Sequence, residues 1–128
     1  MPRDAIATTD APAAIGPYSQ AVWADGLLLC AGQTPIDPAT GRLIEGDVGE
    51  QTRRCFANLF AVLAAAGLGP DDVVKVNVYL VDMADFAAMN AAYAEQFAAP
   101  YPARTTVAVA GLPLGARVEI ELTARARA

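Results

Sequence analysis

Residues 73–81 and 118–123 each alternate between apolar and polar side chains. The apolar positions are Val74, Val76, Val78, Leu80, Val118, Ile120 and Leu122, and the polar positions are Lys75, Asn77, Tyr79, Glu119, Glu121 and Thr123. A period of two is typical of a β-strand that buries one face and exposes the other. The pattern therefore predicts a sheet with one apolar face, which other elements must cover.

Two segments with helical spacing are the candidates to cover that face. Asp47 is the predicted N-cap of the first helix, and Gly67 is its predicted stop. Asp82 is the predicted cap of the second helix, which Pro100 and Pro102 end. The side chains that share one stripe are Val48, Thr52, Cys55, Leu59, Val62, Leu63 and Ala66 in the first segment and Phe86, Met89, Asn90, Tyr93 and Phe97 in the second.

Four further strands complete the expected fold, and they are Ala5–Thr8, Tyr18–Trp23, Leu27–Ala31 and Thr105–Val109. Asp25-Gly26 predicts a hairpin, because glycine tolerates the positive φ of a tight turn. Residues 35–46 are rich in Pro, Gly, Asp and Thr and are predicted to form a loop. The order β-β-β-α-β-α-β-β predicts an α+β fold over residues 1–128, one domain with a mixed six-stranded sheet and both helices on one face. Since two helices leave the second face uncovered, we also expect a homo-oligomer.

Composition excludes several classes of function. The chain has 128 residues, of which 55% are hydrophobic and 18% charged, as is typical of a globular protein. A formal net charge of −5 without a basic patch disfavours nucleic acid as a partner. We expect no signal peptide and no membrane span, and we expect Cys30 and Cys55 to be buried free thiols, which indicates the cytoplasm. The sequence lacks histidine, which removes histidine metal sites and Ser-His catalysis.

Arg104 and Glu119 are the candidate catalytic residues. Arg104 follows Pro102-Ala103 at the start of a strand, where the prolines restrict the backbone. Its guanidinium group can bind a carboxylate with two hydrogen bonds. The alternative is a solvated arginine at a strand end. Glu119 lies inside a strand, where acidic residues are depleted, with Glu121 on the same face. It is interpreted as a base in a cleft, where partial burial would raise its pKa; the alternative is an exposed edge or a salt-bridged interface.

Four other residues have both a functional and a structural interpretation. Tyr18 follows Gly16-Pro17, where a turn would present its phenol to a ligand or simply pack it. Gly32 would let a ligand approach the backbone, or would mark a bulge. Asn90 lies on an apolar helical stripe, where its amide would bind a ligand or cap a strand. Lys75 could form a Schiff base, although an exposed or paired lysine is the alternative that we favour.

Four motifs occur in the order and spacing that characterise the RidA/YjgF family. They are residues 11–21 (Ala-Pro-Ala-Ala-Ile-Gly-Pro-Tyr-Ser-Gln-Ala), 31–35 (Ala-Gly-Gln-Thr-Pro), 101–106 (Tyr-Pro-Ala-Arg-Thr-Thr) and 118–121 (Val-Glu-Ile-Glu). The chain resembles this family over nearly its whole length. The resemblance implies a chorismate-mutase-like α+β fold and a homotrimer with active sites in the clefts between subunits. It also implies hydrolysis of 2-imino or enamine intermediates, which pyridoxal-phosphate dehydratases release.

The same resemblance implies roles for individual residues. Arg104 matches the family arginine that holds the substrate carboxylate, and Glu119 matches the glutamate assigned to the attacking water. The positions that match the family pocket are Tyr18, Gly32 and Asn90. Two departures bear on the substrate: Ala31 stands where many members have serine, and Thr106 stands where many deaminases have cysteine, although its hydroxyl could still bind the substrate.

The implied activity is that of a 2-iminobutanoate/2-iminopropanoate deaminase, which forms 2-oxo acids and ammonia. No cofactor and no metal are expected, and the expected partner is a small 2-imino or 2-oxo acid. Three alternatives stay open: a deaminase of one pathway with an aminomuconate-like substrate, an endoribonuclease, and a non-catalytic ligand-binding or chaperone-like module. The acidic charge and the lack of histidine argue against the endoribonuclease.

Overall fold

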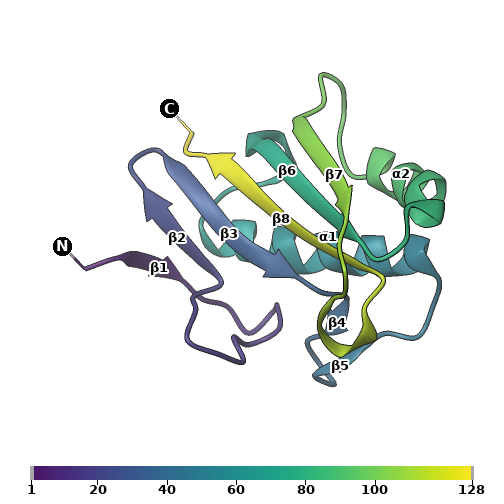
Figure 1. Cartoon of the computed structure of the whole chain (residues 1–128). Helices are drawn as coiled ribbons and strands as arrows, with labels where there is room; N and C mark the ends of the chain where they lie inside the picture. Colours follow the sequence, from purple (N-terminus) through teal and green to yellow (C-terminus); the bar gives the residue numbers. More distant parts are fainter. Residues whose placement is uncertain (1, 128) are drawn as a thin grey trace.

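A computed structural model of the protein describes residues 2–127, and its centre is one mixed six-stranded sheet with the order β1-β2-β3-β8-β6-β7 (Figure 1). The strands are β1 (Asp4–Ile6), β2 (Ala21–Ala24), β3 (Leu27–Gln33), β8 (Val118–Arg125), β6 (Val73–Leu80) and β7 (Ala103–Ala108). Strands β6 and β7 are parallel, and all other neighbours are antiparallel. The mixed sheet predicted from the sequence is confirmed.

Both long helices pack on one face of the sheet. Figure 1 shows α1 (Val48–Ala65) running behind β3, β8 and β6, with α2 (Phe86–Ala94) beside it near β7. The fully buried side chains between helices and sheet include Phe56, Leu59, Val62, Leu63, Val76, Val78, Val118 and Ile120. The expected α+β arrangement is therefore confirmed. No helix in residues 2–127 is long and apolar enough to cross a membrane.

The predicted alternation in β6 is wrong at its first residue. Val73 is buried, whereas Val74 is 36% exposed. The pairing of β6 with β8 shifts between Val73 and Lys75, so one extra residue turns Val74 away from the core. From Val76 onward, the apolar side chains face the helices as expected.

The turn between β2 and β3 also differs from the expectation. A hairpin forms at Asp25-Gly26, but the positive φ of 52° belongs to Asp25 and not to the glycine. Aspartate is among the few residues that tolerate this left-handed conformation. The predicted strand Tyr18–Trp23 begins only at Ala21, because the residues before it belong to a loop.

Three predictions about the remaining segments need correction. The expected loop over residues 35–46 contains a small second sheet, formed by β4 (Ile36–Asp37) and β5 (Arg42–Leu43). Asp82 does not cap α2, because it caps the short 3₁₀ helix η2 (Met83–Asp85), and α2 follows from Phe86. Helix α2 ends at Ala94, well before the first of the prolines that were expected to stop it. The other 3₁₀ helices are η1 (Pro70–Asp72) and η3 (Pro113–Gly115).

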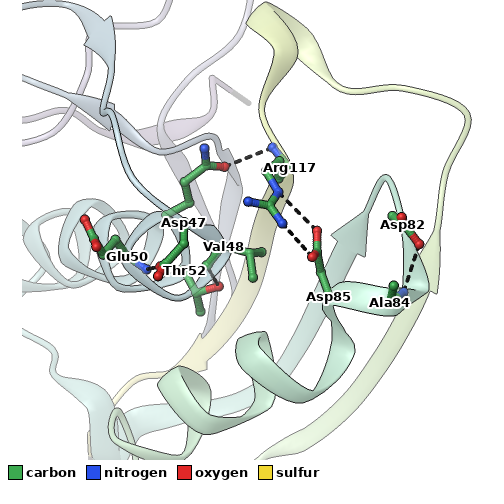
Figure 2. A network of polar contacts seen from close by, with 9 residues as sticks. Asp47, Val48, Glu50, Thr52, Asp82, Ala84, Asp85 and Arg117 are labelled. Atoms are coloured by element: carbon green, nitrogen blue, oxygen red, sulfur yellow. Dashed lines mark hydrogen bonds and ion pairs between the residues drawn. The ribbon is translucent and has the colours of Figure 1, made fainter.

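One arginine, Arg117, connects the start of β8 to both helices through hydrogen bonds (Figure 2). Its guanidinium donates to the carboxylate of Asp85 at 2.6 and 3.2 Å, and its backbone N–H donates to Oε1 of Gln51 at 2.9 Å. Gln51 belongs to α1, and Asp85 directly precedes α2. Because Arg117 is two residues before Glu119, this network fixes the strand from which the candidate base projects.

Candidate functional site

Glu119 projects from β8 into a cavity on the sheet face opposite the helices. The cavity has a volume of about 260 Å³ and is lined by side chains from the N-terminal loop, β3, the residues around β4 and η3. Its lining includes Tyr18, Gly32, Ile15, Leu114 and Glu119. We call this cavity the Glu119 pocket. It brings together three of the predicted site residues, namely Tyr18, Gly32 and Glu119.

Gly32 allows the carboxylate of Glu119 to lie directly on the backbone of β3. A Cβ atom added at Gly32 would be 2.6 Å from Oε2 of Glu119, closer than any real contact. Gly32 lies where the pairing of β3 with β8 shifts between Cys30 and Gln33, so it is part of a β-bulge. The structural interpretation of Gly32 is therefore correct, and the same bulge makes the room in which Glu119 lies.

The carboxylate of Glu119 has an environment that favours its protonated form. Partial burial raises the pKa of Glu119, and the negative charge of Glu121 raises it further. Within residues 2–127, no arginine or lysine lies within ion-pair distance of Glu119. A carboxylate with a raised pKa and no cationic partner is suited to accept a proton from water. No ion pair within residues 2–127 supports the alternative of a salt-bridged glutamate.

Tyr18 is held over the Glu119 pocket by a loop that a buried glutamine organises. The side chain of Gln20 accepts from the N–H of Thr8 at 2.7 Å and donates to the carbonyls of Thr8 and Pro12 at 3.1 and 2.8 Å. These three hydrogen bonds order the loop that precedes β2, while the backbone carbonyl of Gln20 accepts from the N–H of Ala31 at 2.9 Å. The hydroxyl of Tyr18 accepts from the N–H of Ile15 at 3.4 Å, and the ring remains 49% exposed.

Arg104 lies in a second cleft, which is formed between β7 and α2. This cleft of about 440 Å³, the Arg104 pocket, is lined by Asn90, Tyr93, Ala94, Tyr101, Pro102 and Arg104. The guanidinium carbon of Arg104 is 4.6 Å from the ring centroid of Tyr93 and 5.6 Å from that of Phe86. No carboxylate in residues 2–127 lies within ion-pair distance of Arg104. The arginine is therefore neither a freely solvated side chain nor a member of an ion pair in the chain.

Two hydroxyls near Arg104 are buried without a hydrogen-bond partner in the described part of the chain. They are the phenol of Tyr93 and the hydroxyl of Thr106, and the side chains of Arg104 and Thr106 share one face of β7. Leaving a buried hydroxyl without a partner lowers the stability of a folded chain, and the hydrogen bonds within residues 2–127 do not satisfy either group.

The two pockets lie on opposite faces of the sheet. Strand β7 pairs Arg104 with Val76 and Thr106 with Val78, and both valines are fully buried against the helices. Glu119 pairs instead with Tyr79, which points to the opposite face. The structure thus groups Asn90, Arg104 and Thr106 on one side and Tyr18, Gly32 and Glu119 on the other. Within one chain, the two predicted catalytic residues do not meet.

For the remaining candidates, the structural interpretation is correct. Nζ of Lys75 donates to the hydroxyl of Thr105 at 2.9 Å, so this lysine is paired and lies outside both pockets. Cys30 and Cys55 are buried free thiols, as expected. Burial raises the pKa of Cys30 to about 12, and it raises the pKa of Cys55 as well, so neither thiol is a ready nucleophile.

Sequence reasoning missed the aromatic residues beneath Arg104. Phe86 and Tyr93 were assigned to the apolar stripe of the second helix together with Asn90, which is where aromatic residues usually serve as core. Their spacing of seven residues places them on one helical face, two turns apart, so they could have been identified as flanking Asn90. The sequence held no signal that this face would meet Arg104, because that contact depends on β7 lying beside α2.

These features define a small α+β protein that carries an acidic pocket and a cationic pocket on opposite sheet faces. The family described as Endoribonuclease L-PSP matches residues 8–126, and the chain belongs to this family, which is also called RidA/YjgF. A RutC family protein of Pyrococcus horikoshii is 51% identical over 95% of this chain and 97% of its own length. The 2-iminobutanoate/2-iminopropanoate deaminase of Mus musculus is 48% identical over 95% of this chain and 90% of its own length. A crystal structure of E. coli TdcF with bound serine has a TM-score of 0.90 and 39% identity, covering 97% of this chain and 99% of the other.

Proposed function

We propose that the protein is a deaminase that hydrolyses 2-iminobutanoate, 2-iminopropanoate and similar 2-imino acids to 2-oxo acids and ammonia. The name of the mouse relative supports this reaction. The serine bound to E. coli TdcF supports a small carboxylate ligand of amino-acid size. The proposed location is the cytoplasm, which the two unpaired thiols favour.

The observation that carries the proposal is the division of the site into two halves of complementary chemistry. The Arg104 pocket offers an unpaired guanidinium, which suits a substrate carboxylate. The Glu119 pocket offers a carboxylate whose pKa is raised, which suits a general base. Because one chain holds these halves on opposite faces, we propose that they meet across a subunit boundary. A closed homotrimer, in which each Arg104 pocket faces the next subunit's Glu119 pocket, forms complete sites from identical chains.

The mechanism follows from these two groups. Arg104 binds the substrate carboxylate, which places the imine carbon beside the water on Glu119. Glu119 removes a proton from this water as its oxygen attacks the imine carbon and the C=N electron pair moves to nitrogen. Glu119 then returns this proton to nitrogen, which gives a carbinolamine with a hydroxyl and an NH2 group on one carbon. In the last step, Glu119 takes the hydroxyl proton and passes it to nitrogen, so that the C=O bond forms as the C–N bond breaks and ammonia leaves. Imines already hydrolyse in water, and a positioned base typically adds about 10²–10⁴-fold.

The test couples the purified protein to a threonine dehydratase and follows the release of 2-oxobutanoate. We expect the wild-type protein to speed release, and we expect Arg104→Ala and Glu119→Gln each to lower kcat/KM by at least about 100-fold. Lys75→Ala removes a paired lysine outside both pockets and is the matched control. Wild-type activity in Arg104→Ala would exclude the carboxylate anchor, and wild-type activity in Glu119→Gln would exclude the base.

The family description includes endoribonuclease, but no feature of the two pockets favours RNA. The net charge is −5, and the two pockets together contain one arginine and no lysine. Thr106 and Ala31 leave room for a deaminase of one pathway with an aminomuconate-like substrate. Comparing kcat/KM for imines from threonine and serine with that for a longer enamine decides between the two substrate classes.

A further inference from the structure

Arg104 lies against two aromatic rings that come from the same face of α2. Phe86 and Tyr93 are seven residues apart, so their side chains lie two helical turns apart, with Asn90 between them. The guanidinium carbon is 4.6 Å from the centroid of Tyr93 and 5.6 Å from the centroid of Phe86. Both distances are within the range of a cation–π interaction, and the ring of Tyr93 makes the closer contact.

The ring of Tyr93 is itself held by the core. The residue is only 5% exposed, and the centroid of its ring is 5.5 Å from that of Phe56 and 5.4 Å from that of Phe97. Because Phe56 is fully buried in the close-packed core, the ring of Tyr93 is held next to Arg104. Tyr93 therefore links the rigid core of the protein to the guanidinium.

Arg104 lacks the polar partners that normally orient an arginine. No carboxylate in residues 2–127 lies within ion-pair distance, so the aromatic faces are the contacts that restrict its guanidinium. An arginine side chain loses much rotamer freedom when it is ordered, and a ligand that must order it binds more weakly. A ring that orders the guanidinium in advance removes this loss from the binding step.

We propose that Tyr93 is a positioning residue, whose ring holds the guanidinium of Arg104 ready for the carboxylate of the substrate. The proposal deepens the proposed function, since it rests on Arg104 being the carboxylate anchor. The proposal assigns this role to the ring of Tyr93, which makes the closer of the two contacts with the guanidinium, and not to its phenol oxygen.

The experiment compares Tyr93→Leu, which removes the ring, with Tyr93→Phe, which keeps it. Phe60→Leu is the matched control, because Phe60 belongs to the same aromatic cluster but packs against Phe56 and Phe97 and not against Tyr93 or Arg104. The assembled protein is used throughout. The first measurement is the NMR signal of the Nε–H group of Arg104, assigned by its loss in Arg104→Lys, since a proton near a ring face is shifted by the ring current. The second is the Kd for pyruvate, and the third is kcat and KM in the coupled assay.

We expect Tyr93→Leu to move the Arg104 signal toward the position of a free arginine and to raise both the Kd for pyruvate and KM by about 10-fold. The change in kcat should be smaller, because the ring acts on carboxylate binding. Tyr93→Phe keeps the ring and should retain the wild-type Arg104 signal. Phe60→Leu should lower Tm without changing the signal or the Kd.

Three results would overturn the proposal: an unchanged Arg104 signal in Tyr93→Leu, an equal change of the signal in Phe60→Leu, or an equal change of the signal in Tyr93→Phe. If Tyr93→Leu does not fold, Tyr93→Met fills the same space without a ring and takes its place in the comparison. If the wild-type protein neither binds pyruvate nor releases 2-oxo acid, the proposed function fails. The NMR comparison then still decides whether Tyr93 orders Arg104.

Discussion

The contact between Gly32 and Glu119 makes a prediction at the scale of one methyl group. In Gly32→Ala, the new Cβ would meet the end of a flexible side chain, so the carboxylate should move while the strands stay in place. We expect kcat to fall by about 100-fold, as is typical when a catalytic group moves by about 1 Å. The free energy of unfolding should change by less than about 1 kcal/mol. Both are measured on the same preparation, by the coupled assay and by urea unfolding.

Gly26→Ala is the control for this substitution, because a Cβ at Gly26 would meet nothing within 4 Å and the residue does not have a positive φ. It should leave kcat unchanged. A Gly32→Ala variant with wild-type kcat would show that the carboxylate of Glu119 does not need its place on β3.

A second prediction concerns the charge of Glu121. Burial is the main cause of the raised pKa of Glu119, and Glu121 adds to it. Since the base must be deprotonated, kcat/KM should fall when the pH drops through this pKa. Glu121→Gln removes a negative charge, so it should lower the pKa of Glu119 and shift the acidic limb of the profile to lower pH. The limb should stay above pH 4.5, the ordinary pKa of glutamate, because the burial remains.

The measurement is kcat/KM from the coupled assay between pH 4 and 8, the range in which carboxylates near their ordinary pKa values and above titrate. Asn77 donates to Oε2 of Glu121 at 3.1 Å, and a glutamine oxygen can still accept this bond. Glu45→Gln, at an exposed position, is the control and should leave the profile in place. An acidic limb that does not move in Glu121→Gln would mean that another group controls it.

At the scale of the elements, Arg117 connects the strand of Glu119 to the two helices (Figure 2). Asp85→Asn removes the negative charge from the bidentate ion pair with Arg117, in which the side chain of Asp85 is only 14% exposed. We expect a loss of about 1 kcal/mol in the free energy of unfolding, because paired geometry raises such an interaction above an ordinary surface pair. Urea unfolding measures it. Glu95→Gln breaks the exposed pair with Arg53 and should change stability by less than about 0.5 kcal/mol. Equal effects of the two variants would contradict this reasoning.

The sequence predicted the elements well and their edges less well. The strands and helices follow from periodicity, which local side chains determine. Their limits depend on contacts between residues that lie far apart in the sequence, such as the hydrogen bonds from the side chain of Gln20 to Thr8 and Pro12 in the loop before β2. The shift that exposes Val74 likewise comes from pairing with β8 and has no signature within β6 itself.

The candidate site shows the same difference between what local sequence determines and what contacts between distant residues determine. Alternation alone placed Glu119 and Glu121 on one face of their strand, opposite the buried residues. It could not relate this face to that of Arg104, because the relation depends on how β7 pairs with β6. Residue types and motifs therefore identified the right groups, but they could not show that one chain keeps Arg104 and Glu119 apart.

At the scale of the whole molecule, the open face of the sheet needs a cover. Leu27, Leu29 and Val107 are each more than 40% exposed there, beside the polar residues of β6 and β8. The sequence already indicated this face, since two helices cannot cover both sides of a sheet. The proposed trimer would bury it and would join the two halves of the site.

Mixed trimers test this arrangement. The two variants Arg104→Ala and Glu119→Gln are unfolded and refolded together in equal amounts. A site is then intact only if its Arg104 comes from a Glu119→Gln subunit and its Glu119 comes from an Arg104→Ala subunit. Random assembly gives about a quarter of the wild-type sites, because each of the two halves is intact with a chance of about one half. The coupled assay should therefore recover about a quarter of wild-type activity, although each variant refolded alone is inactive. No recovery in trimers that contain both variants would mean that the two groups do not meet across subunits.

On the proposed trimer, the positions of Arg104 and Glu119 on opposite faces of the sheet would also make activity depend on protein concentration. A single chain would hold all the chemical groups without a complete site. Dilution would then inactivate the protein while every subunit kept its fold. Heat would inactivate it at the temperature where subunits part, and that temperature would rise with concentration even where the unfolding of each chain does not.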